Sequence, residues 1–148
     1  MHTLIIENLY EELLGCWNKG DAKGMASLFT GDACIVGFDG SQYTGSAEFE
    51  ENLEKIFSHH KVASYVGEIR DLRLLSPDIC MLQAVVGMIP PGKSDLDPSK
   101  NAIQTVLFQY ADEWKIVLFQ NTPAQFHGNP EAAEMLTRGL RGLVPVAA

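Results

Sequence analysis

The segment that most constrains the fold lies late in the chain, where two apolar runs flank a short break. Residues 103–110 form the first run and residues 114–122 the second, and both are rich in β-branched and aromatic side chains. Such runs are typical of β-strands, and the three residues between them, 111–113, suit a tight turn. The segment therefore predicts a long antiparallel hairpin.

The glutamines of this hairpin give its two faces a functional meaning. If Tyr110 pairs with Trp114, Gln104 and Gln120 share one face with most of the apolar side chains. On the same register Asn121 falls on the opposite, more polar face, which suits a dimer interface or solvent. An amide on an apolar face either has a partner in the core or points into a cavity. We favour the cavity, where an amide orients a ligand rather than catalysing, because it has no useful proton to give or take.

Helices come before strands in the rest of the chain. Apolar spacing and turn residues predict, in order, a helix over 3–19, a short helix capped by Asp21, strands over 33–38 and 42–44, a helix from Ser46 to about 59, strands over 62–75 and 79–89, and a helix beginning at Asn129-Pro130. This segregation predicts an α+β fold, with helices on one face of a curved antiparallel sheet. We expect a single domain over residues 1–142 and a flexible tail over 143–148.

Composition limits the possible partners and the compartment. A formal net charge of −8 and scattered Lys and Arg residues argue against binding nucleic acid or an anionic membrane. No apolar run approaches the roughly 18 residues of a membrane span, and the N-terminus lacks the basic start of a secretory signal. Cys16, Cys34 and Cys80 are widely separated and lie among apolar neighbours, which favours reduced, buried and inert thiols in a cytoplasmic protein.

Short motifs are spread over nearly the whole chain. They are Trp17-Asn18-Lys19-Gly20-Asp21, Ser27-Leu28-Phe29-Thr30-Gly31-Asp32-Ala33, Gly37-Phe38-Asp39-Gly40 with Tyr43-x-Gly45, Asn101-Ala102-x-Gln104-Thr105, and Trp114-Lys115-Ile116-x-x-Phe119-Gln120-Asn121-Thr122-Pro123. In this combination the chain resembles the SnoaL-like branch of the nuclear-transport-factor-two-like superfamily, most closely its SgcJ/EcaC-type subgroup. Members of that superfamily include isomerases, cyclases, dehydratases and proteins without a known reaction.

The resemblance implies a cone-shaped curved antiparallel sheet wrapped around three N-terminal helices, with an additional C-terminal helix. It also implies a homodimer formed through the outer face of the sheet, and a pocket between the helices and the inner face. Family geometry and the alternation of side chains suggest ten lining residues for that pocket: Tyr10, Trp17, Phe29, Phe38, Phe57, Tyr65, Met88, Gln104, Phe108 and Gln120. Five of them are more often simple core than ligand wall, namely Trp17, Phe29, Phe38, Phe57 and Phe108.

Asp39 is a candidate catalytic base. The best-understood enzymes of this superfamily use a carboxylate base together with a tyrosine and an acid that stabilise an enolate. Asp39 and Tyr10 lie in roughly corresponding regions, but Asp39-Gly40 also reads as an ordinary hairpin turn. The segment that should supply the second acid reads Ala-Val-Val-Gly-Met over 84–88, so the ketosteroid-isomerase mechanism is not supported.

His59 and His60 are further candidates for acid–base chemistry, at the predicted end of the third helix. A histidine there usually interacts with the helix dipole, although one of the two could reach the mouth of the cone. His127 could similarly reach the rim. No spacing of His, Cys, Asp or Glu matches a metal site, and no phosphate-binding glycine loop is present, so we expect neither metal nor cofactor.

Three functional hypotheses follow. The favoured one is a protein that binds a small hydrophobic molecule in a pocket, with proton-transfer chemistry on a cyclic metabolite left open. The second is a non-catalytic dimerisation or association module of the same fold. The third is a true isomerase or dehydratase, which requires a pocket residue that titrates near neutral pH.

Overall fold

The computed structural model describes residues 2–145, and the last three residues of the predicted flexible tail lie outside that range. The elements are α1 (His2–Lys19), α2 (Ala22–Ala26), β1 (Phe29–Val36), β2 (Gln42–Thr44), α3 (Ser46–His59), β3 (Ser64–Ser76), β4 (Ile79–Ile89), the 3₁₀ turn η1 (Pro98–Lys100), β5 (Ala102–Ala111), β6 (Glu113–Pro123) and α4 (Pro130–Arg141). No helix of this range is long and apolar enough to cross a membrane.

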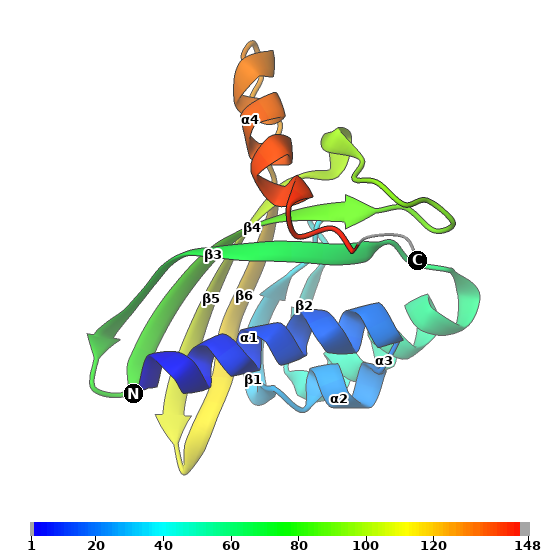
Figure 1. The fold of residues 1–148 in the computed structure, drawn as a ribbon. Helices are drawn as coiled ribbons and strands as arrows, with labels where there is room; N and C mark the ends of the chain where they lie inside the picture. The colour runs from blue at the N-terminus through cyan, green and yellow to red at the C-terminus, as the bar shows by residue number, and fades with distance from the viewer. Residues whose placement is uncertain (1, 146–148) are drawn as a thin grey trace.

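The six strands form one curved sheet in the order β2-β1-β6-β5-β4-β3. Helices α1, α2 and α3 lie along one face of the sheet, and α4 stands on the other side (Figure 1). This arrangement confirms the α+β cone predicted from the sequence. One pairing differs from a purely antiparallel sheet, because β1 runs parallel to β6, with Ile35 opposite Phe119.

Local sequence signals explain where the first three helices begin and end. Helix α1 buries a stripe that includes Tyr10 and Leu13 against the sheet. Gly20 ends it with a φ of +72°, a conformation that glycine adopts without steric cost. The carboxylate of Asp21 then accepts a hydrogen bond from the backbone N–H of Gly24 and caps α2. Gly45, which immediately precedes α3, also has a positive φ, of +86°.

The late hairpin pairs Tyr110 with Trp114 as predicted, but its register changes further along. Leu107 lies opposite Leu118, whereas the next residue, Phe108, lies opposite Ile116. Val117 is therefore a β-bulge, and beyond it the side chains of β6 exchange faces relative to a regular strand.

The bulge overturns the predicted faces of the late polar residues. Gln104 lies opposite Asn121, and both side chains are buried. Gln120 instead lies opposite Thr105 and is exposed. The prediction that Gln120 shares the inner face with Gln104, and that Asn121 lies on the outer face, is therefore wrong.

Helix α4 packs on the outer face of the sheet. Its residues Leu136 and Leu140 are buried together with Val85 of β4 and Leu96 of the preceding loop. The cap predicted for this helix is present, since Asn129 Oδ1 accepts a hydrogen bond from the Ala132 N–H at 3.1 Å. Met135 lies on the outward side of the helix and is 68% exposed.

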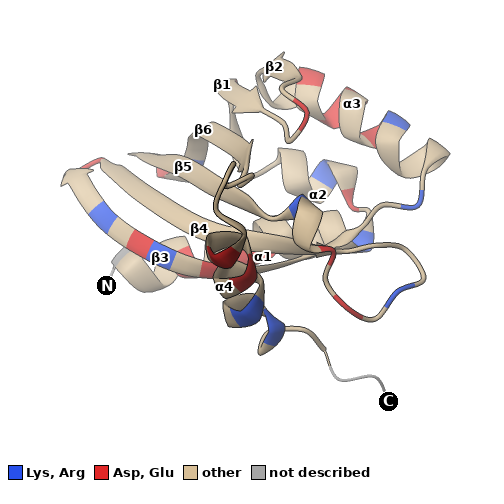
Figure 2. Cartoon of the chain, turned by 90° about the horizontal axis from the view of Figure 1, so that it is seen from above, with Lys and Arg blue, Asp and Glu red and all other residues tan. Residues whose placement is uncertain are grey.

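Edge strand β3 carries alternating charges along its exposed length (Figure 2). Glu68 pairs with Arg70 at 3.4 Å, and Asp71 pairs with Arg73 at 3.4 Å. Charges on an edge strand oppose pairing with another strand. An association between copies of this chain is therefore more favourable through a sheet face than through this edge.

Candidate functional site

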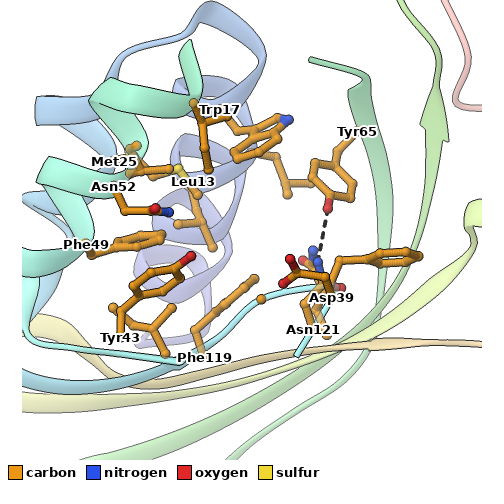
Figure 3. Close-up of a pocket in the computed structure, with 17 residues that line it drawn as sticks. Leu13, Trp17, Met25, Asp39, Tyr43, Phe49, Asn52, Tyr65, Phe119 and Asn121 are labelled. Carbon is orange, nitrogen blue, oxygen red and sulfur yellow. Dashed lines mark hydrogen bonds between the residues drawn. The ribbon is translucent and has the colours of Figure 1, made fainter. Parts of the chain in front are cut away.

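A cavity of about 230 Å³ lies between the three N-terminal helices and the inner face of the sheet. Figure 3 shows its walls, with side chains from α1, α2 and α3 facing side chains from the strands. Its lining residues are Leu13, Leu14, Trp17, Met25, Ile35, Gly37, Phe38, Asp39, Tyr43, Phe49, Asn52, Leu53, Ile56, Tyr65, Gln104, Phe119 and Asn121.

Most of the cavity wall is aliphatic or aromatic. Trp17 is held against Phe57 with ring centroids 5.2 Å apart, and its indole N–H donates to the Ala63 carbonyl at 2.8 Å. Within residues 2–145, Asp39 is the one charged side chain of the lining, and no Lys, Arg or His contributes to it. The wall therefore favours an uncharged occupant over an anion.

Tyr65 and Asn121 form a polar pair on one side of the cavity (Figure 3). The Asn121 Nδ2 donates to the Tyr65 hydroxyl oxygen at 3.0 Å. The side chains of Tyr65 and Asn121 are only 8% and 6% exposed, and the Asn121 Oδ1 has no hydrogen-bond partner. Burial raises the pKa of Tyr65 to about 12, so its hydroxyl keeps its proton at neutral pH.

Tyr10 and Gln104 form a second buried polar pair. The Tyr10 hydroxyl donates to Gln104 Oε1 at 2.6 Å. Burial, and to a lesser degree the neighbouring Tyr65, raises the pKa of Tyr10, so this hydroxyl is a fixed donor. Tyr10 contacts only the amide oxygen of Gln104, so the amide nitrogen takes no part in this bond. Gln104 itself lines the cavity.

We predict that Tyr10→Phe lowers the free energy of unfolding by about 2 kcal/mol, because it leaves the buried Gln104 Oε1 without a donor. Urea denaturation of the variant measures this loss. The double variant Tyr10→Phe/Gln104→Leu removes both partners and should be more stable than the sum of the two single effects implies. Strict additivity would show that the 2.6 Å contact contributes nothing to stability.

Asp39 lies at the cavity, but its environment is that of a turn residue. Its Oδ1 accepts a hydrogen bond from the backbone N–H of Ser41 at 2.9 Å, and this bond lowers the pKa of the carboxyl. The side chain is exposed rather than enclosed. A general base that works near neutral pH needs the opposite shift.

The three candidate histidines, His59, His60 and His127, lie away from the cavity. His59 is the last residue of α3, and His60 follows it with its backbone N–H donating to the Ile56 carbonyl at 3.0 Å. Both side chains are exposed, as is His127 in the loop before α4, and none of them lines the cavity. Among residues 2–145, no three His, Cys, Asp or Glu side chains come together in a way that could hold a metal ion.

The structure brings together four of the ten predicted lining residues: Trp17, Phe38, Tyr65 and Gln104. Two others lie directly behind the wall, since Tyr10 binds Gln104 and Phe57 packs on Trp17. Phe29 and Phe108 belong to the packed core, whereas Met88 packs beside Tyr65 without lining the cavity and Gln120 faces outward.

Asn52 and Asn121 are the lining amides that sequence reasoning missed. Asn52 lies on the apolar stripe of α3, at the spacing i, i+3, i+4, i+7 with Phe49, Leu53 and Ile56. A polar residue on such a stripe is the same signal that singled out Gln104. For Asn121 the sequence gives no such signal, because the bulge at Val117 determines its face.

A sequence model described as the SnoaL-like domain matches residues 6–121 of this chain. A comparison with curated proteins finds no match. The SgcJ/EcaC-type subgroup stays a prediction.

Solved structures share the fold. A domain of unknown function with a cystatin-like fold from Nostoc punctiforme PCC 73102 superposes with a TM-score of 0.79 at 21% identity, over 95% of each chain. A putative calcium/calmodulin-dependent protein kinase type II association domain from Thiobacillus denitrificans ATCC 25259 gives 0.70 at 11% identity, over 80% of this chain and 94% of that one. A ketosteroid isomerase-like protein from Erwinia carotovora atroseptica SCRI1043 gives 0.63 at 15% identity, over 82% and 95%. At these identities the likeness shows the fold alone.

Proposed function

The chain belongs to the SnoaL-like domain family, and from that premise we propose that it binds a small, neutral cyclic molecule in the cavity between α1, α3 and the inner face of the sheet. The observation that carries the proposal is an apolar cavity whose wall includes Asn121, a buried amide with an unpaired Oδ1. A buried polar atom without a partner costs about 1–3 kcal/mol in a core, which is a reason to expect a ligand there.

The size of the cavity suggests the size of the ligand. An apolar cavity of about 150 Å³ is large enough for benzene, whereas sites for drug-sized molecules start near 300 Å³. At about 230 Å³, this cavity suits a molecule of one or two rings.

The charge of the chain supports the same class of partner. A formal net charge of −8 and dispersed Lys and Arg residues (Figure 2) disfavour a nucleic acid or an anionic membrane. The three cysteines are free thiols, which fits a protein that works in the cytoplasm. Cys16 and Cys80 are buried as predicted, whereas Cys34 is exposed, so the prediction of a buried thiol is wrong for Cys34.

Binding rather than turnover is the function that the residues support. Proton transfer would depend on Asp39, whose pKa is lowered by its turn, and the facing part of β4 supplies no second acid. An isomerase or dehydratase would use Asp39 as its base, because this carboxylate lies at the cavity. In an isomerase or dehydratase, Asp39→Asn would abolish any turnover found. In a protein that only binds, the variant would keep its affinity for the ligand.

Thermal shift with ring compounds tests the binding proposal. We expect indole, quinoline or 2-quinolone at ten times its Kd to raise the Tm by roughly 4 °C. Ile56→Trp, which fills the cavity from α3, should remove that shift. The matched variant Met135→Trp places the same side chain on the exposed face of α4 and should keep it. Equal shifts in both variants would place binding outside the cavity.

We propose in addition that two copies associate through the outer face of the sheet. Met81, Leu107, Leu118 and Cys34 form a row across four adjacent strands on that face. Helix α4 covers a different part of it, around Val85. Met81, Leu107 and Leu118 are half-buried and Cys34 is exposed, and an apolar row of this kind suits a dimer interface.

Leu118→Glu should weaken the dimer about 100-fold or more, because it places two carboxylates at the interface. Light scattering after size exclusion at micromolar concentration measures the change. The matched variant Leu75→Glu, at the exposed end of β3, should remain dimeric. A wild-type chain that is monomeric at this concentration contradicts the dimer, and with it an association module as the function.

A further inference from the structure

The cavity holds its polar groups in an arrangement that selects a ligand class. Among the described residues, two buried side-chain atoms have no hydrogen-bond partner, Asn101 Oδ1 and Asn121 Oδ1. Asn101 is packed beneath α4, where its amide nitrogen donates to Thr137 at 2.7 Å and its Oδ1 lies close to Gly87. Asn121 lines the cavity. It is therefore the one of the two that belongs to the cavity wall.

The neighbouring hydroxyl adds a donor to this acceptor. Because Asn121 Nδ2 donates to the Tyr65 oxygen, the hydroxyl hydrogen of Tyr65 is left for another acceptor. Tyr65 and Asn121 together then present one donor and one acceptor side by side.

The same arrangement results from either orientation of the amide. If Tyr65 donated to Asn121 Oδ1, the amide nitrogen would be the free donor and the phenol oxygen the free acceptor. The pair thus offers a donor next to an acceptor in both cases, and among the residues that the structure describes no Lys, Arg or His lines the cavity to hold an anionic group.

From this geometry, and resting on the proposed binding function, we infer that the ligand is a ring compound whose edge carries an adjacent hydrogen-bond donor and acceptor, as in a cyclic cis-amide (a lactam), and that Tyr65 and Asn121 bind this edge. A ring that fills the cavity binds well only if it offers a hydrogen bond to each member of this pair, because a buried donor or acceptor that stays unpaired costs free energy. A lactam N–H and C=O supply both bonds. Aliphatic and aromatic side chains then enclose the rest of the ring.

Closely matched probes test this inference. 2-Quinolone carries the N–H and C=O on adjacent ring atoms, 4-quinolone carries the same groups across the ring, and N-methyl-2-quinolone lacks the donor. Calorimetric titration should show 2-quinolone binding about tenfold more tightly than either of the other two, because each loses one hydrogen bond to a buried partner.

Two variants test whether Tyr65 and Asn121 cause the preference for 2-quinolone. Asn121→Leu should reduce the affinity for 2-quinolone about tenfold and leave that for N-methyl-2-quinolone within about twofold, because the methylated ring has no N–H for Asn121 Oδ1. Tyr65→Phe should reduce the affinity for both compounds about tenfold, because both carry the C=O that the Tyr65 hydroxyl binds. Chemical shifts of the Asn121 side-chain amide in the wild-type protein provide a readout that does not depend on a variant folding. They should move with 2-quinolone.

The outcomes separate the two proposals. Equal affinities for all three quinolones overturn the lactam inference and leave the binding function standing. A preference for 2-quinolone over N-methyl-2-quinolone that survives Asn121→Leu, without a shift of the Asn121 amide in the wild-type protein, also overturns it. If neither the quinolones nor indole binds, both proposals fail.

Discussion

Replacing Gly45 with alanine should lower the free energy of unfolding by about 4 kcal/mol, the largest effect that we expect from a single methyl group in this chain. Gly45 joins β2 to α3 with φ and ψ of +86° and 157°, a region that is essentially restricted to glycine. A Cβ at this position would lie 2.3 Å from the carbonyl oxygen of Gly31, and a backbone atom cannot turn aside as a side chain can. Chemical denaturation measures the loss.

Gly40→Ala is the matched control for this prediction. Gly40 also has a positive φ, of +89°, but an added Cβ there meets no atom within 4 Å. Its loss should be about 1–2 kcal/mol, from the backbone conformation alone. If both variants lose the same amount, the close contact with Gly31 is not what requires glycine at position 45.

Leu53→Ala should lower the free energy of unfolding by about 3 kcal/mol and also lower the affinity for a ligand in the cavity. Leu53 is 1% exposed on α3, and its side chain forms part of the cavity wall. Truncation removes buried apolar contacts and enlarges the space that a ligand fills. Denaturation measures the first effect, and titration with indole measures the second.

Leu82→Ala separates stability from binding. Leu82 is fully buried in the same core but does not line the cavity. Its truncation should cost a similar free energy of unfolding and leave the affinity for indole unchanged. A loss of indole affinity in Leu82→Ala as large as in Leu53→Ala would indicate that general loosening of the core, rather than the wall, controls binding.

The order and class of the elements could be predicted from the sequence because local signals agree with one another. Gly20 and Asp21 separate the first two helices, and Asn129-Pro130 starts the last one. The parallel pairing of β1 with β6 could not be predicted in this way. It joins segments about 85 residues apart, and no turn fixes their alignment.

The lining of the cavity could be predicted only in part, and the bulge at Val117 is the main reason. Ile116, Val117, Leu118 and Phe119 are all apolar, because the outer face of β6 carries apolar side chains as well as the inner face. A run that is apolar on both faces gives no alternation by which to locate an extra residue. Only Gln120 and Asn121 reveal the exchange of faces, since Gln120 is exposed and Asn121 is buried.

The presence of Asn121 instead of Gln120 on the inner face changes the chemistry of the site. With Gln120 in the cavity, two glutamines would have faced each other. With Asn121 there instead, an amide contacts the hydroxyl of Tyr65 and keeps one atom unpaired. The ligand proposal depends on that single shift of register.

The central claim is that a small neutral ring binds inside the cavity, and amide chemical shifts during a titration with indole test it most directly. We predict saturable shifts for residues that line the cavity, such as Leu53, Tyr65 and Asn121, and none for Leu107 or Gln120 on the outer face. Shifts confined to the outer face or to α4, or no saturable shift at all, would contradict the claim.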